Sequence, residues 1–134
     1  MVLDTSALVA ILTGEPEQRS FIAAIDAADS RLLSTASYVE SSIVIEARYG
    51  AAGVADLDLF LRRATITLVP VDEEQALAAR RAFSRFGRGR HAAGLNYGDC
   101  FSYALASVSA EPLLCKGSDF RRTDIVCVQT DGEP

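Results

Sequence analysis

Short apolar runs alternate with amphipathic stretches along most of this 134-residue chain. The runs lie at residues 2–3, 31–35, 66–69, 113–115 and 125–128, and their apolar and β-branched content is typical of buried strands. The longer stretches between them place apolar side chains on one helical face. Strands that alternate with helices indicate a parallel sheet covered on both faces. The pattern therefore predicts an α/β fold, a three-layer α/β/α sandwich with a central parallel sheet of four to five short strands.

Capping residues and a glycine mark the expected ends of several helices. Thr5 or Ser6 can cap the first helix, because a hydroxyl oxygen accepts from backbone N–H groups of the first turn. Ser37 and Glu40 have the spacing of a capping box, and Gly50 would end the helix that they open. We expect the helices at residues 7–12, after Pro16, from Ser37 to about Tyr49, and at 54–64, 72–86 and 97–109.

Length and composition indicate a single domain over residues 1–134. With 49% hydrophobic and 23% charged residues, the chain can bury a core as globular proteins do. Its apolar runs fall short of the ~20 residues of a membrane span, and its start lacks the pattern of a signal peptide. We therefore expect a cytoplasmic protein with no membrane contact. The three cysteines form no CxxC pair, which argues against a disulfide framework and a zinc site.

Four acidic residues, far apart in sequence, follow predicted strands or open predicted helices: Asp4, Glu40, Asp99 and Asp119. Strand ends and the helix starts that follow them share one edge of a parallel sheet. For Asp99, the loop at residues 87–95 would have to carry the chain back to that edge. Clustered carboxylates repel one another, and a divalent cation relieves the repulsion. Mg²⁺ or Mn²⁺ prefers oxygen ligands and can activate water against a phosphodiester. Each acid also has a purely structural explanation, as a cap or turn residue, so placement leaves function open.

Charge is unevenly distributed along the chain. The net charge of −5 disfavours nucleic-acid binding on average. Between Gln75 and Gly98, however, there is no acid, while this segment holds the only histidine, His91, and a set of arginines. Because salt screens charges over ~8–10 Å, a basic face can coexist with an acidic average. A solvated helix face explains the same residues equally well. The candidate RNA-binding residues are Arg80, Arg81, Arg85, Arg88 and Arg90.

Five segments stand out together: residues 1–8 (MVLDTSAL), 34–40 (STASYVE), 94–101 (GLNYGDCF), 113–120 (LLCKGSDF) and 123–125 (TDI). In order and spacing they resemble the PIN-domain ribonuclease toxins of the VapC type. The resemblance implies the toxin of a type II toxin–antitoxin system, a Mg²⁺- or Mn²⁺-dependent endoribonuclease. Such a toxin blocks translation by cutting structured tRNA, rRNA or mRNA. It also implies a VapB-type antitoxin as partner and a homodimer.

The resemblance also implies roles for the acids. Asp4 and Asp99 match the principal metal ligands, and Glu40 matches a third acid that binds directly or through water. Asp119 matches the fourth catalytic acid, at a more variable position. Ser118 beside it is a candidate neighbour of the site, whereas Asp124 is expected to be structural.

Two alternatives without catalysis remain open at this point. A receiver-like phosphoacceptor domain also has acids at a sheet edge, but it needs an acidic pair near the start and an acceptor aspartate after a middle strand. Here the start has one acid, and Pro70 follows the run at 66–69. The other alternative is a domain of the toxin type that only binds its antitoxin, which the four intact acids disfavour.

Overall fold

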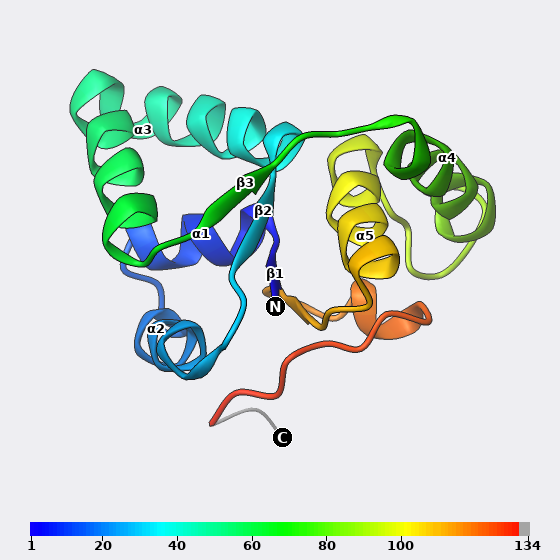
Figure 1. Ribbon diagram of the computed structural model, residues 1–134. Coiled ribbons are helices and arrows are strands. Elements are labelled where there is room, and N and C mark those ends of the chain that lie inside the picture. The colour runs from blue at the N-terminus through cyan, green and yellow to red at the C-terminus, as the bar shows by residue number, and fades with distance from the viewer. Residues whose placement is uncertain (132–134) are drawn as a thin grey trace.

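The computed structural model describes residues 1–131 and arranges them around a four-stranded parallel sheet (Figure 1). Its strands are β1 (Val2–Leu3), β2 (Leu32–Ser34), β3 (Thr67–Val69) and β4 (Leu113–Leu114), in the order β3-β2-β1-β4. All three pairings are parallel. The run at 125–128 adds a parallel bridge between Cys127 and Leu113 beyond β4. The predicted parallel sheet is confirmed.

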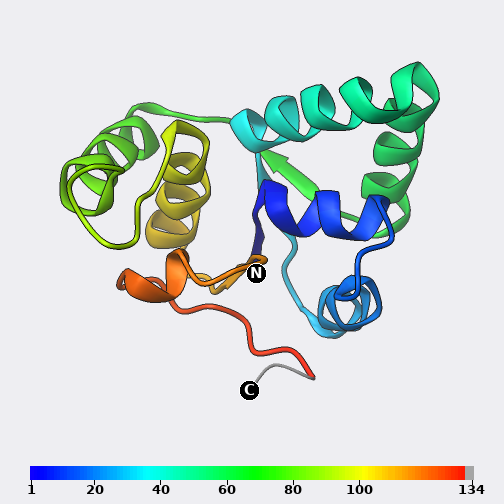
Figure 2. The same ribbon diagram turned by 180° about the vertical axis from the view of Figure 1, so that it is seen from behind.

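Helices cover both faces of this sheet, as Figures 1 and 2 show. The helices α1 (Thr5–Leu12), α2 (Gln18–Ala27) and the second half of α3 (Thr35–Arg63) pack on one face. The helix α5 (Tyr97–Ser109) lies on the other face, and α4 (Glu73–Phe86) packs against α5. The predicted three-layer α/β/α arrangement is therefore confirmed. Within residues 1–131, no helix is both long and apolar enough to cross a membrane.

The short strands divide their side chains between two hydrophobic cores, because successive residues of a strand point to opposite faces. Val2 and Leu113 pack with α4 and α5. Leu3, Leu33 and Leu114 pack with α1, α2 and α3. All five are at most 1% exposed, and burying a leucine contributes about 1.5–3 kcal/mol. These two cores hold the carboxyl edge of the sheet in place.

The start of α3 differs from the prediction. Ser34 at the end of β2 is the cap, and its hydroxyl accepts from the N–H of Ala36 at 3.2 Å. Ser37 is buried inside the helix, and its hydroxyl lies 3.2 Å from that of Ser102 on α5. The predicted capping box of Ser37 and Glu40 is wrong, because the helix follows the strand without an intervening turn. Gly50, with φ 68° and ψ −160°, breaks the helix where the sequence predicted its end.

The loop of residues 87–95 also differs from the expectation that it would carry the chain back across the layer. Its two ends lie side by side, because the N–H of Leu95 donates to the carbonyl of Phe86 at 3.0 Å and the N–H of Arg88 donates to the carbonyl of Leu95 at 2.9 Å. Since α4 packs on α5, its direction is not tied to that of the strands. Its end therefore already lies near the start of α5, which carries Asp99.

Candidate active site

The structure places each predicted acid at or just after the carboxyl end of a strand or at a helix start. Asp4 follows β1 and caps α1, and Glu40 lies in α3, which directly follows β2. Asp99 is in the first turn of α5, and Asp119 follows β4 and precedes the 3-10 turn η1 (Phe120–Arg122). Four separate parts of the chain thus contribute one acid each to the same region.

Asp4 is the most buried of these acids, with 4% of its surface exposed. Its Oδ2 accepts from the N–H of Ser6 at 3.0 Å and from the hydroxyl of Ser6 at 2.6 Å. Its Oδ1 accepts from the hydroxyl of Ser102 at 2.6 Å, and Ser102 in turn lies beside Ser37. These hydrogen bonds offset the cost of burying a charge and hold the carboxylate in one orientation.

Sequence reasoning missed Ser102. It lies 98 positions from Asp4, so no local pattern connects them. One signal was available, because Ser102 follows Asp99 by three residues on α5 and so shares its helical face. A serine on the buried side of an apolar helix needs a polar partner, and here that partner is the carboxylate of Asp4.

Asp99 shows that the acids lie close enough to interact. Burial raises the pKa of its carboxyl group to about 6; the N–H of Asn96, at 3.0 Å from Oδ2, opposes that rise. Repulsion from Asp4, Glu40 and Asp119 raises the same pKa further. Asn96 also accepts from the N–H of Asp99 at 2.9 Å, which completes a capping box and pins the first turn of α5. Burial and the neighbouring acids therefore both disfavour the ionised form of Asp99 in the folded chain.

The loop after β4 is tied to α1. The backbone N–H of Lys116 donates to the hydroxyl oxygen of Ser6 at 3.0 Å. The ammonium group of Lys116 pairs with Glu15 and lies 3.5 Å from Glu17. These contacts hold the segment that leads to Ser118 and Asp119 beside the Asp4 region.

Asp124 has other partners. Its carboxylate accepts from the Tyr103 hydroxyl at 2.6 Å and pairs with Arg85 at 3.2 Å. These contacts connect the C-terminal segment to α4 and α5, in keeping with the structural role expected for this residue.

The acidic region suits a hard divalent cation by its chemistry. Among residues 1–131, no three acidic, histidine or cysteine side chains converge closely enough to hold one ion as they stand. Mg²⁺ and similar ions are often bound by only one or two carboxylates, with water completing the shell. Carboxylate oxygens are the donors that such ions prefer, and a cation would relieve the repulsion that raises the pKa of Asp99. The residues present therefore fit such an ion.

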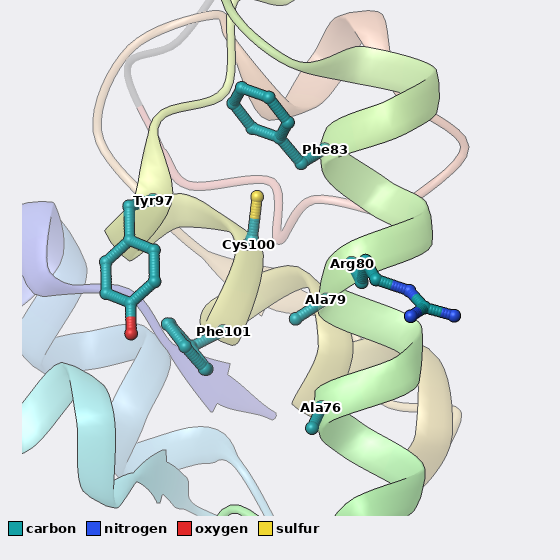
Figure 3. A pocket seen from close by; sticks show the side chains of 7 residues that line it. All are labelled: Ala76, Ala79, Arg80, Phe83, Tyr97, Cys100 and Phe101. Carbon is teal, nitrogen blue, oxygen red and sulfur yellow. The ribbon is translucent and has the colours of Figure 1, made fainter.

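The five predicted RNA-binding arginines lie exposed on α4 and the loop that follows it. The guanidinium of Arg85 lies 4.6 Å above the ring of Phe86, and that of Arg90 lies 5.8 Å from the ring of Phe83. Between α4 and the start of α5 is an apolar groove of about 440 Å³ (Figure 3). The guanidinium of Arg80 points away from this groove. The groove is lined by Ala76, Ala79, Arg80, Phe83, Tyr97, Cys100 and Phe101.

Fold and site together define an α/β/α protein with an acidic cluster at the carboxyl edge of its sheet. Residues 1–126 match the PIN domain family. The chain is 59% identical to ribonuclease VapC30 of Mycobacterium tuberculosis over 96% of its own length and 98% of that protein. It is also 59% identical to ribonuclease VapC of Mycolicibacterium smegmatis, over 96% and 99%. The chain belongs to the PIN-domain family and, within it, to the VapC ribonucleases, which generally depend on a divalent metal.

Solved structures share the fold at low sequence identity. The crystal structure of M. tuberculosis VapC20, a sarcin-ricin loop cleaving toxin, matches with a TM-score of 0.77 at 14% identity, over 96% of this chain and 98% of that one. VapBC-1 from nontypeable Haemophilus influenzae matches with a TM-score of 0.73 at 16% identity, over 96% of both chains. At this identity, the two likenesses establish the fold.

Proposed function

We propose that this chain, as one PIN domain, is the toxin of a type II toxin–antitoxin system and hydrolyses RNA phosphodiesters with Asp4, Glu40, Asp99 and Asp119. The observation that carries the site assignment is geometric: Asp4 ends β1, and the Glu40 carboxylate lies against the first turn of α5, beside Asp99. The carboxylate of Asp99 is repelled by the other three, although all four come from separate parts of the chain. A purely structural set of caps would give no reason for this convergence. Family membership supports the same reaction class.

In this proposal, Asp4 and Asp99 hold Mg²⁺ or Mn²⁺, and Glu40 binds it directly or through water. When bound, the ion lowers the pKa of a coordinated water and neutralises charge on the phosphate. Asp4 contributes a fixed carboxylate, because Ser6 and Ser102 hold both of its oxygens. Asp99 stays in place through its capping box with Asn96. Asp119 completes the acidic rim on the loop after β4.

The test is cleavage of total RNA and of defined RNA fragments by purified protein. We expect defined cuts with Mg²⁺ or Mn²⁺, none with EDTA, and none with Asp4→Asn or Asp99→Asn. Asp26→Asn is a matched control, because Asp26 is an exposed acid on α2 outside the cluster. Equal cutting by Asp99→Asn and the unchanged protein would refute the site assignment. Comparing the two metals would identify the preferred ion.

We propose that the exposed arginines of α4 and the following loop bind RNA phosphates. These residues are Arg80, Arg81, Arg85, Arg88 and Arg90. The arginines are exposed, and residues 75–98 contain no acid; both observations support this use. Removing one arginine that binds a phosphate should reduce the salt slope of binding by about 0.7–0.9. Replacing Arg80, Arg81 and Arg88 by alanine tests this, with Arg62→Ala and Arg63→Ala on α3 as the control. An unchanged salt dependence of RNA binding would contradict this proposal.

We propose a VapB-type antitoxin as the partner of this chain. The structural relatives include VapBC2 from Rickettsia felis bound to a DNA fragment from their promoter, and a toxin–antitoxin complex from Klebsiella pneumoniae. In this proposal the bound partner keeps the nuclease inactive. Co-expression with the product of an adjacent short reading frame, followed by co-purification and loss of RNA cleavage, tests the pairing. A cytoplasmic location fits both this partner and the RNA substrates.

We also propose a homodimer. Large apolar side chains are exposed on α3 and at the start of α5: Val39 at 55%, Ile43 at 61% and Tyr97 at 79%. Val39 and Ile43 are four residues apart on α3 and so share one helical face, and large exposed apolar patches commonly mark interfaces. Light scattering on the unchanged protein and on Ile43→Glu tests this state, and a dimer unaffected by the substitution would place its interface elsewhere.

A further inference from the structure

Gly98 and Glu40 make an unusually close contact at the acidic edge of the sheet. Gly98 is in the first turn of α5, directly before Asp99. A Cβ atom added to Gly98 would lie 2.6 Å from Cδ of Glu40, 2.8 Å from its Oε1 and closer still to its Oε2. Ordinary van der Waals contacts of such an atom are 3.4–4 Å. The Glu40 carboxylate thus occupies the space that the side chain of any residue other than glycine would need at position 98.

Backbone conformation does not explain this glycine. Among residues 1–131, the glycines with positive φ are Gly14, Gly50, Gly89, Gly94 and Gly117. Gly98 instead has helical geometry within α5, where glycine is less favourable than alanine. The three nearest atoms to the added Cβ all belong to the carboxyl end of Glu40, and none belongs to a packed helix backbone. The requirement for glycine therefore comes from one polar side chain.

The two sides of this contact differ in stiffness. On α5, the reciprocal hydrogen bonds between Asn96 and Asp99, at 2.9 and 3.0 Å, pin the turn that contains Gly98. On α3, the Glu40 carboxylate is the far end of a flexible side chain. A side chain at position 98 would therefore displace the carboxylate of Glu40 and leave the turn in place.

We propose that Gly98 is a positioning residue whose missing side chain seats the Glu40 carboxylate against the first turn of α5, beside Asp99. This inference rests on the proposed role of Glu40 in the metal site. It extends that role, because it identifies what holds the third acid close to the other two. Gly98 touches neither metal nor RNA in this proposal and acts only through Glu40.

Gly98→Ala tests the proposal, with Gly53→Ala as the matched control. Both glycines lie in helices, and an added Cβ would meet a neighbour too closely at each; at Gly53 it would lie 2.6 Å from Cβ of Tyr49 and 3.0 Å from Cγ2 of Ile45. At Gly53 those neighbours are short or branched side chains that cannot swing away. We expect Gly53→Ala to lower the melting temperature and to leave cleavage per folded molecule unchanged. Gly98→Ala should keep the melting temperature within a few degrees.

We expect Gly98→Ala to lose about 10- to 100-fold in kcat/KM and a comparable factor in Mn²⁺ affinity, measured by calorimetry without RNA. In the Glu40→Ala background, the same Gly98→Ala change should have no further effect on either quantity. Normal Mn²⁺ affinity and cleavage in Gly98→Ala, with both reduced in Glu40→Ala, would overturn the positioning role alone. Normal affinity and cleavage in Glu40→Ala would overturn the proposed role of Glu40 and this inference with it. If Gly98→Ala lowers kcat/KM and Mn²⁺ affinity by the same factors in the Glu40→Ala background as in the unchanged protein, the positioning role is also overturned.

Discussion

Asp99→Asn should make the folded protein more stable while it removes cleavage. The pKa of Asp99 is raised from 3.8 to about 6. The main cause is burial, and repulsion from Asp4, Glu40 and Asp119 adds to it. The folded chain therefore binds this proton more tightly than the unfolded chain does. The favourable contribution of the protonated group is fully present below about pH 4 and is lost as the pH rises towards 6. At neutral pH the ionised carboxylate opposes folding.

The size of the effect follows from that shift. A difference of about two pKa units corresponds to about 3 kcal/mol at neutral pH as an upper bound. Asp99 is only partly buried, so solvent screening reduces this figure to about 1–2 kcal/mol. For a domain of this size the gain corresponds to a rise of roughly 3–8 °C in melting temperature. Asparagine keeps the shape of the side chain and an oxygen acceptor for the N–H of Asn96.

Urea unfolding at pH 7.5 and pH 5, with EDTA present, measures this gain. The stabilisation by Asp99→Asn should be larger at pH 7.5 than at pH 5. Asp72→Asn is the control, because Asp72 caps α4 by accepting from the N–H of Gln75 at 2.9 Å and is exposed. That change should bring no gain. A less stable Asp99→Asn protein at pH 7.5, or an equal gain from Asp72→Asn, would show that burial and acidic neighbours do not disfavour the ionised Asp99 carboxylate as argued.

Three further predictions concern the surroundings of the cluster. Mn²⁺ should raise the melting temperature more at pH 7.5 than at pH 5, because protonated Asp99 competes with the ion; a pH-independent rise would contradict this. Ser102→Ala should slow cleavage by about 10- to 100-fold and cost about 1–3 kcal/mol in urea unfolding, because Asp4 loses a buried donor; unchanged kinetics would remove Ser102 from the site. Asp124→Asn should weaken the contact with Tyr103 by about 1 kcal/mol and leave cleavage unchanged; a large loss of cleavage would give Asp124 a role in the reaction.

Much of the fold was predictable because its signals are local. The strands coincide with short apolar runs of the sequence, and Asn96 and Asp72 cap their helices through hydrogen bonds that span three residues. The errors came where tertiary packing overrode a local pattern. Ser37 fits a capping box, yet it lies inside α3 and faces Ser102. The predicted course of the loop at 87–95 was wrong because α4 packs on α5 and not on the sheet.

The candidate site likewise has features that the sequence predicts and features that depend on tertiary packing. The order of strands and helices was enough to predict that Asp4, Glu40 and Asp119 share one edge, because strand ends and following helix starts meet there. Asp99 was expected at the same edge, but α5 follows another helix, so its place depends on how α4 packs against α5. Hydrogen-bond partners, burial and close contacts depend instead on segments far apart in the chain. The sequence does not reveal that Ser102 holds Asp4, or that Gly98 is a glycine because Glu40 lies against it. Those contacts exist only once α3 and α5 meet over the end of β1, since a carboxylate's position is set by whatever atoms pack around it.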